Sequence, residues 1–94
     1  MPRKKRVKDY QQKLEQALAV LKVIAEDNTT PRNIRRVAKE ASDVLNDENL
    51  SPAVRASNAI DMLEEISQDP NMPPYTRVRI WNAISALEGI RDYP

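Results

Sequence analysis

The sequence predicts an all-α domain, folded as an antiparallel four-helix bundle. Apolar residues recur with helical spacing in four successive segments, and prolines mark the turns between these segments. The 94-residue chain has 4% aromatic residues, one glycine, and no cysteine, histidine or phenylalanine. It shows no run typical of a β-strand, and its length leaves no room for a second core. We therefore expect one small helical domain.

The first helix is predicted to cover residues 9–26. Its apolar residues are spaced by one, three and four positions, which places them on one face of an α-helix. They are Tyr10, Leu14, Ala17, Leu18, Leu21, Ile24 and Ala25. Val20 and Val23 widen this face, so we expect contacts with more than one neighbouring helix. Asp27 and Asn28 end the helix.

The second and third helices are each expected to begin at a proline that follows a hydroxyl residue. Thr30 is predicted to cap the second helix, with Pro31 as its first residue, and Ser51 and Pro52 repeat this arrangement for the third. The residues expected to face inward are Ile34, Val37, Ala38, Ala41, Val44, Leu45, Ala56, Ala59, Ile60, Leu63 and Ile66. Polar residues end both helices before the next proline.

The fourth helix is expected to follow Pro73 and Pro74. Its apolar residues occupy two edges, with Val78, Trp81, Ile84 and Leu87 on one and Ile80, Ala83 and Ile90 on the other. The spacing predicts that Trp81 belongs to the core. Tyr75 lies in the first turn and is expected to be partly exposed, whereas Gly89 is expected in a fraying end.

Two patterns recur along the chain. The sequence Asn-x-x-Pro begins at Asn28, Asn49 and Asn71, and the pattern of residues 21–45 returns at residues 63–87. This indicates a helical hairpin used twice, and the third helix resembles the second helix of a HEAT-type repeat. Because two hairpins are too few for an open solenoid, we expect them to close into a bundle with a HEAT-like internal repeat. Small residues expected to face inward are Ala38, Ala41, Ala59, Ala83 and Ala86.

Charge is distributed unevenly along the chain. Of 15 basic and 14 acidic residues, five cations and no acid fall within the first eight positions. We therefore interpret residues 1–8 as a basic N-terminal arm and residues 9–94 as a single domain with excess negative charge. The arm is either a disordered, solubilising tail or a phosphate-binding arm for RNA or DNA.

Two of the predicted helices carry charged stripes of opposite sign. The basic stripe consists of Arg32, Arg35, Arg36 and Lys39, and the acidic stripe of Asp61, Glu64, Glu65 and Gln68. Either these stripes are solvated faces with weak ion pairs between them, or they bind partners. As binding surfaces, they would grip a phosphate backbone or pair with another protein or protomer. The candidate contact residues are Arg3, Lys4, Lys5, Arg6, Lys8, Arg32, Arg35, Arg36 and Lys39.

The residue types argue against an enzyme. Without histidine or cysteine the chain lacks the usual acid–base, nucleophilic and zinc-binding groups, and one glycine leaves no phosphate loop. Carboxylate pairs such as Glu64-Glu65 are adjacent in sequence and point apart on a helix. We predict no catalytic residue, cofactor or metal, with a carboxylate-bound metal enzyme as a minor alternative. No apolar run approaches about 20 residues, so a cytoplasmic protein without a membrane partner is expected.

Several stretches resemble one known family. The Asn-x-[Thr/Ser/Pro]-Pro turns and residues 31–41, 50–60 and 69–77 are similar to the archaeal uncharacterised protein family 0147, over roughly residues 9–94. The resemblance implies a compact helical bundle from an archaeon and transfers no catalytic or binding residue. The expected role is a non-enzymatic interaction or accessory module that binds a protein partner or itself. The alternative is an RNA- or ribosome-associated protein that uses the basic arm and stripe.

Overall fold

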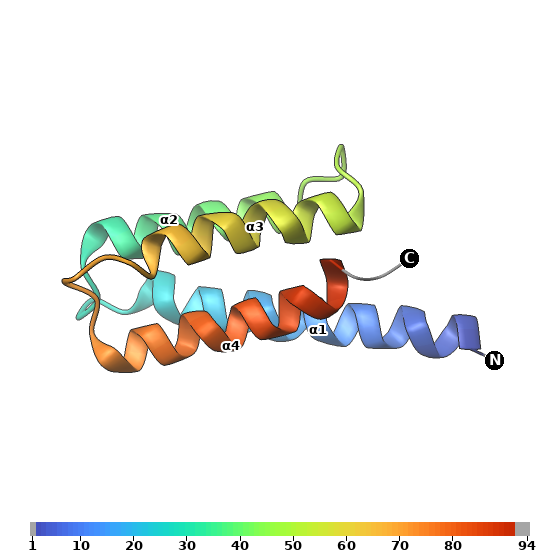
Figure 1. Ribbon diagram of the computed structural model, residues 1–94, viewed down its shortest axis with the longest axis horizontal. Coiled ribbons are helices and arrows are strands. Elements are labelled where there is room, and N and C mark those ends of the chain that lie inside the picture. Colours follow the sequence, from blue (N-terminus) through green and yellow to red (C-terminus); the bar gives the residue numbers. More distant parts are fainter. Residues whose placement is uncertain (1, 92–94) are drawn as a thin grey trace.

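The computed structural model describes the backbone of residues 2–91 and the side chains of residues 9–91. Within this part of the chain all regular structure is helical, as the sequence predicts. The helices are α1 (Pro2–Glu26), α2 (Arg32–Leu45), α3 (Pro52–Ile66) and α4 (Pro74–Arg91). Short turns join them, so consecutive helices run antiparallel (Figure 1).

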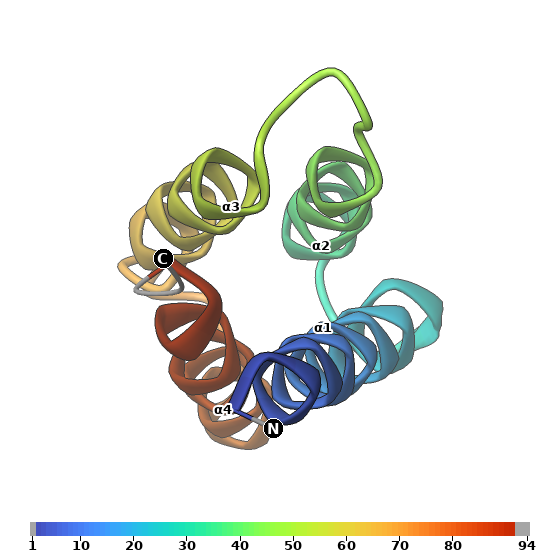
Figure 2. The same ribbon diagram turned by 90° about the vertical axis from the view of Figure 1, so that its right-hand side faces the viewer.

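Seen end-on, the four helices form a closed ring (Figure 2). Helices α1 and α3 each pack against both α2 and α4. The packing of α1 against α4 makes the first and last helices neighbours and closes the bundle. The predicted closed bundle is therefore confirmed over the open solenoid, whereas the HEAT-like internal repeat stays a prediction.

The core combines branched aliphatic residues with alanines. The largest fully buried apolar side chains are Leu21, Ile24, Ile34, Leu45, Ile60, Leu63, Ile80, Ile84, Leu87 and Ile90. All five alanines predicted to face inward are at most 7% exposed. Their small side chains allow the helix axes to approach closely, so the predicted placement of the alanines is confirmed.

An aspartate organises each of the three turns. Asp27, Asp47 and Asp69 each accept, through Oδ1, a hydrogen bond from the backbone N–H two residues later, at 2.9, 3.0 and 2.8 Å. The backbone carbonyl of each aspartate also accepts from the N–H three residues later. These Asx turns reverse the chain ahead of each proline. The repeated signal at the turns therefore includes the aspartate as well as the Asn-x-x-Pro pattern.

One of the two predicted N-caps is correct. The Ser51 Oγ accepts a hydrogen bond of 3.3 Å from the Val54 N–H at the start of α3. The prediction that Thr30 caps α2 is wrong, because α2 begins at Arg32 and has no side-chain cap. Thr30 is instead buried, and its hydroxyl donates to Asp27. The Thr30 hydroxyl also lies 3.3 Å from the Thr76 hydroxyl of α4, so it links the α1–α2 turn to α4 and does not cap α2.

The inward face of α4 also differs from the prediction. Its buried residues are Thr76, Ile80, Ala83, Ile84, Ala86, Leu87 and Ile90. Trp81 is 45% exposed and Val78 is 60% exposed, so placing Trp81 in the core is wrong. Tyr75 is 45% exposed, as expected. Gly89 lies inside α4, where the Lys13 side chain from α1 crosses it, rather than in a frayed end.

Helix α1 begins before the predicted boundary. Its backbone is helical from Pro2, and its first turns project past the ends of the neighbouring helices (Figure 1). The division into residues 1–8 and residues 9–94 stays a prediction. The side chains of the five predicted contact residues in this segment, Arg3, Lys4, Lys5, Arg6 and Lys8, lie outside the described residues.

Candidate functional site

The four residues of the basic stripe surround a hollow between α1 and α2. Arg32, Arg35, Arg36 and Lys39 line a depression of about 310 Å³ together with Ala25 of α1. Spacings of three and four residues place the cations on one side of α2, and the small side chain of Ala25 leaves space beside them. We call this depression the basic hollow.

Two of these charges are partly balanced within α2. The Arg36 Nε lies 3.7 Å from Glu40 Oε1, and the Lys39 Nζ lies 3.8 Å from Asp43 Oδ1. The four side chains of these two ion pairs are each more than half exposed. Exposed pairs between residues four positions apart on a helix contribute only about 0.3–0.5 kcal/mol each. Among residues 9–91, the ion pairs of the basic stripe stay within α2 and do not reach the acidic stripe of α3.

Arg35 differs from the other cations of the basic hollow. It is half-buried, and its Nε is shielded from solvent without a hydrogen-bond partner among the described residues. A buried donor without an acceptor costs about 1–3 kcal/mol, and more when the donor is charged. An acceptor in the basic hollow would offset this cost once the Arg35 side chain turned its Nε toward it.

A second depression lies on the other side of α2, between α2 and α3. It has a volume of about 460 Å³. Its lining includes the half-buried apolar residues Val37, Met62 and Ile66 and the acidic residues Glu40, Glu65 and Asp69. We call it the acidic groove. Helix α2 therefore separates a basic surface from an acidic one.

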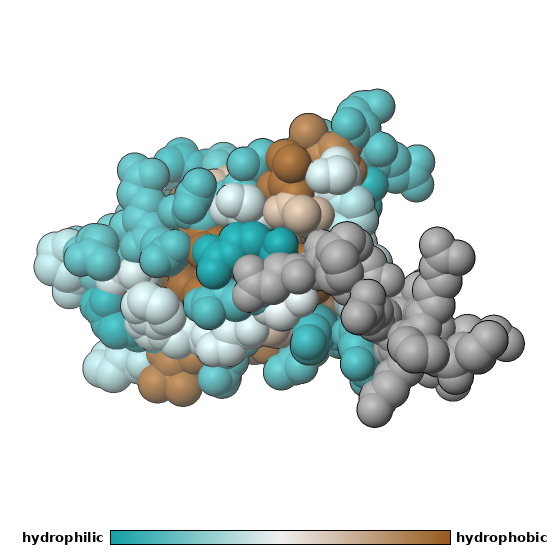
Figure 3. Space-filling model, turned by 45° about the vertical axis from the view of Figure 1, so that its right-hand side comes forward, coloured by the Kyte–Doolittle hydropathy of each residue, from teal (hydrophilic) through white to brown (hydrophobic). Residues whose placement is uncertain are grey.

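The outward face of α4 exposes large apolar and aromatic side chains. Tyr75, Val78 and Trp81 are spaced by three residues and are 45%, 60% and 45% exposed. We call these three residues the α4 stripe. Figure 3 shows one face of the molecule, on which a mainly hydrophilic surface is interrupted by apolar patches. Sequence reasoning missed the α4 stripe because it assigned Trp81 and Val78 to an inward edge.

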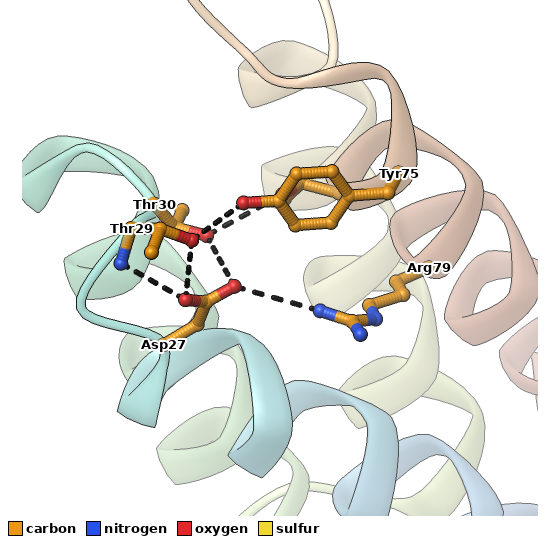
Figure 4. A network of polar contacts seen from close by, with 6 residues as sticks. Asp27, Thr29, Thr30, Tyr75 and Arg79 are labelled. Carbon is orange, nitrogen blue, oxygen red and sulfur yellow. Dashed lines mark hydrogen bonds and ion pairs between the residues drawn. The ribbon is translucent and has the colours of Figure 1, made fainter.

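A polar network joins the α1–α2 turn to the start of α4 (Figure 4). Asp27 accepts hydrogen bonds from the Thr29 N–H at 2.9 Å, the Thr29 hydroxyl at 2.6 Å and the Thr30 hydroxyl at 3.1 Å. The Tyr75 hydroxyl lies 2.5 Å from the Thr29 Oγ1. Because Thr29 gives its single hydroxyl proton to Asp27, Tyr75 is the donor in this pair. The Arg79 Nη1 lies 3.6 Å from Asp27 Oδ2, and its guanidinium stands 5.3 Å from the centroid of the Tyr75 ring.

Matching contacts fix the α3–α4 turn at the same end of the bundle. The Asn33 Nδ2 donates to Asp69 Oδ2 at 2.7 Å, and the Arg77 guanidinium donates to the backbone carbonyls of Ser67 and Asp69. These contacts join the first turns of α2 and α4 to the α3–α4 turn. Over residues 9–91, no group of three or more carboxylate, histidine or cysteine side chains is placed to hold a metal ion.

The turn networks lower the pKa of two carboxyl groups. The hydroxyl and backbone N–H of Thr29, aided by Thr30 and Arg79, hold the pKa of Asp27 below its ordinary value. The Asn71 N–H, together with Asn33 and Arg77, has the same effect on the pKa of Asp69. Hydrogen bonds to the ionised form favour that form, so both networks are built for charged carboxylates.

We expect the protein to lose stability as the pH falls below about 4. The pKa of Asp27 and Asp69 is lower in the folded chain than the unfolded value of about 3.9, so the unfolded chain binds protons more readily. This stabilisation is complete above the unfolded pKa and is lost as the pH falls through the folded pKa. Thermal melts between about pH 6 and about pH 2 measure it.

Asp27→Asn removes one of these two carboxylates. The stability of this variant should therefore fall less between about pH 6 and about pH 2 than that of the unaltered protein. Asp47→Asn is the matched control, because Asp47 accepts the same kind of backbone hydrogen bond within its turn, whereas Asp27 also accepts from two threonine hydroxyls and pairs with Arg79. We expect Asp47→Asn to retain most of the acid dependence. An acid dependence in Asp27→Asn equal to that of the unaltered protein would show that the network does not act through this carboxylate.

The sequence model of the uncharacterised protein family UPF0147 matches residues 1–90. The chain belongs to this family. A UPF0147 protein from Sulfurisphaera tokodaii is 56% identical over 84 residues, which cover 89% of this chain and 94% of that protein. One from Aeropyrum pernix is 55% identical over 84 residues and covers 89% and 92% of the two chains. The resemblance inferred from the turn motifs is therefore confirmed.

Solved structures of similar proteins share the fold. The crystal structure of a UPF0147 protein from Thermoplasma acidophilum has a TM-score of 0.85 and 31% identity, covering 88% of this chain and 98% of that chain. A second crystal structure, of a protein of unknown function, has a TM-score of 0.79 and 46% identity and covers 81% and 86%. UPF0147 is a family of unknown function, so these relatives assign no activity. None of the helices in the described part of this chain has the length and apolarity to span a bilayer.

Proposed function

We propose that this UPF0147 protein is a non-enzymatic interaction module that binds a protein partner. The observation that carries the proposal is the α4 stripe, in which Val78 and the single tryptophan, Trp81, are 60% and 45% exposed. Tryptophan and tyrosine are enriched among the residues that dominate binding at protein interfaces. Clustered apolar side chains that a fold leaves exposed mark surfaces for association.

The charged surfaces beside α2 support a role in recognition. The basic hollow and the acidic groove lie on opposite sides of one helix, and the ion pairs seen at the basic stripe are exposed and within α2. Charges of this kind steer encounters and fix the orientation of a partner more than they add affinity. Because α2 lies diagonally across the ring from α4, these charges form a recognition surface separate from the α4 stripe (Figure 2).

A double substitution on α4 tests this proposal. Val78→Ala with Trp81→Ala removes the two apolar side chains that carry the α4 stripe, and both residues lie outside the buried core. Val54→Ala is the matched control, because Val54 is a 44% exposed valine on α3. The measurements are capture of partners at low salt and sedimentation velocity, which also detects self-association.

We expect one specific partner, or a self-associated form, with the unaltered protein and with Val54→Ala. The double variant should lose it while still unfolding in a single cooperative transition. If the captured proteins and the oligomeric state are the same for all three proteins, the α4 stripe is not the binding surface.

A second candidate function is RNA binding through the phosphate backbone. The observation that favours it is the basic hollow, where α2 presents four cations on one side. Deletion of residues 1–8 and the substitution Lys39→Gln should each weaken binding of a single-stranded RNA oligonucleotide. Each should also flatten the dependence of affinity on salt, by about one unit of slope for every phosphate that the variant no longer neutralises. An unchanged slope in both variants would contradict RNA binding by these residues.

A further inference from the structure

We propose that the basic hollow is a binding site for a phosphoryl group. Arg35 would donate hydrogen bonds to it through the edge of its guanidinium. The inference deepens the second candidate function, because the same site would meet a phosphate of an RNA backbone. It is also open to a free phosphate, and the chemistry of recognition is the same for both sources.

The first support is the state of the Arg35 guanidinium. Its Nε is buried and has no hydrogen-bond acceptor among the described residues, although Arg35 lines the open basic hollow. An arginine presents its Nε and a terminal nitrogen as a flat fork that matches two oxygens of a phosphate. Because the Nε is closed to solvent, the Arg35 side chain must turn toward the hollow before a phosphoryl oxygen can supply the acceptor that the described part of the protein does not.

The second support is the number of positive charges around Arg35. Arg32, Arg36 and Lys39 line the same hollow. Within residues 9–91, the carboxylates paired with these cations are Glu40 and Asp43, at 3.7 and 3.8 Å in exposed pairs. A phosphoryl group carries up to about two negative charges and three strong acceptor oxygens. It therefore matches a cluster of four cations better than a single carboxylate does.

The site is suited to a phosphoryl group rather than to a nucleotide base. Readers of single-stranded nucleic acid stack bases on aromatic side chains. The described aromatic residues lie elsewhere: Tyr75 and Trp81 are on α4, and Tyr10 is 15 residues from Ala25, which corresponds to about 22 Å along α1. The basic hollow would thus recognise charge and geometry without reading sequence.

The test compares one substitution at two positions of the same stripe. Arg35→Lys and Arg36→Lys both keep the charge and remove the planar fork. Inorganic phosphate is titrated at constant ionic strength, with sodium chloride as compensating salt, and the arginine Nε–H signals are followed by nuclear magnetic resonance. We expect the Arg35 signal of the unaltered protein to move with phosphate and not with chloride.

The two variants should respond differently. Arg35→Lys should weaken phosphate binding by about tenfold or more, the effect of losing one charge-assisted hydrogen bond. Arg36→Lys, which changes an exposed side chain, should weaken it less than about threefold. Equal weakening in both variants, or an Arg35 signal that phosphate does not move, would overturn the site. The signal of the unaltered protein decides the matter even if Arg35→Lys fails to fold.

A second arm replaces inorganic phosphate with a single-stranded RNA oligonucleotide. If phosphate moves the Arg35 signal and RNA does not bind, the phosphoryl site stands and the RNA-binding candidate fails. If RNA binds but neither ligand moves the Arg35 signal, the site proposed here fails and RNA binding rests on other cations. A movement of the signal in both arms supports a site that accepts a backbone phosphate.

Discussion

Replacing Leu63 with alanine is expected to destabilise the protein by about 2–5 kcal/mol. Leu63 is completely buried in α3, and its side chain belongs to the core shared by all four helices. The truncation removes buried apolar surface and leaves a cavity. The surrounding side chains and helices can relax into this cavity only in part. Because domains of this kind are stable by about 5–15 kcal/mol, the loss is a large share of the total.

Chemical denaturation at neutral pH measures this loss. The matched control is Leu18→Ala, because Leu18 is only partly buried and packs at the edge of the core. We expect the control to lose less stability than Leu63→Ala. Equal losses at the two positions would mean that the interior of the bundle is not packed as described.

Replacing Ala59 with leucine is expected to destabilise the protein by about 1–3 kcal/mol, although the new side chain is more apolar. Ala59 is completely buried in α3, where a small residue permits close approach of the neighbouring helices. The larger side chain would force helices apart or adopt an unfavourable rotamer. In a domain of this size, each kcal/mol lowers the melting temperature by about 4–8 °C.

The same substitution on the surface separates packing from helix propensity. Ala19 lies exposed on α1, and leucine and alanine are both good helix formers. Ala19→Leu should therefore melt within a few degrees of the unaltered protein. If Ala59→Leu melts as high as Ala19→Leu, position 59 has room that a close-packed bundle would not leave.

The helices and most of the core could be predicted because local signals and packing agree. In α2 the apolar residues share one face: Ile34, Ala38, Ala41 and Leu45 at its centre are buried, whereas Val37 and Val44 at its edge are half-buried. The Ser51-Pro52 start of α3 is a local signal that needs no tertiary contact. The spacing of the basic residues in α2 predicted that they share one side of the helix, and the four residues of the basic stripe line one depression.

The buried face of α4 could not be predicted from the sequence, because apolar residues cover both edges of this helix. The positions of α1 and α3 decide which residues become buried, and they leave Val78 and Trp81 outside. Thr30 failed as a predicted cap for a similar reason. Its hydroxyl lies 3.1 Å from Asp27 Oδ2 in the same turn and 3.3 Å from the Thr76 hydroxyl of α4. Thr30 and Thr76 are 46 positions apart, so no local sequence rule could pair them.

The candidate surfaces were predictable only in outline. The basic stripe follows from helical spacing, but the state of Arg35 depends on how α2 sits against Ala25 of α1. The α4 stripe depends entirely on tertiary packing, so composition and periodicity pointed away from it. A surface defined by what the bundle leaves uncovered becomes visible only when the bundle is assembled.

The role of the α4 stripe can be measured through Trp81, the single tryptophan of the chain. Quenching of its fluorescence by acrylamide reports how accessible the side chain is in the isolated protein and in a complex recovered at low salt. We expect strong quenching in the isolated protein and clear protection in the complex. A tryptophan already protected in the isolated monomer, or equally accessible in the complex, would contradict binding through α4.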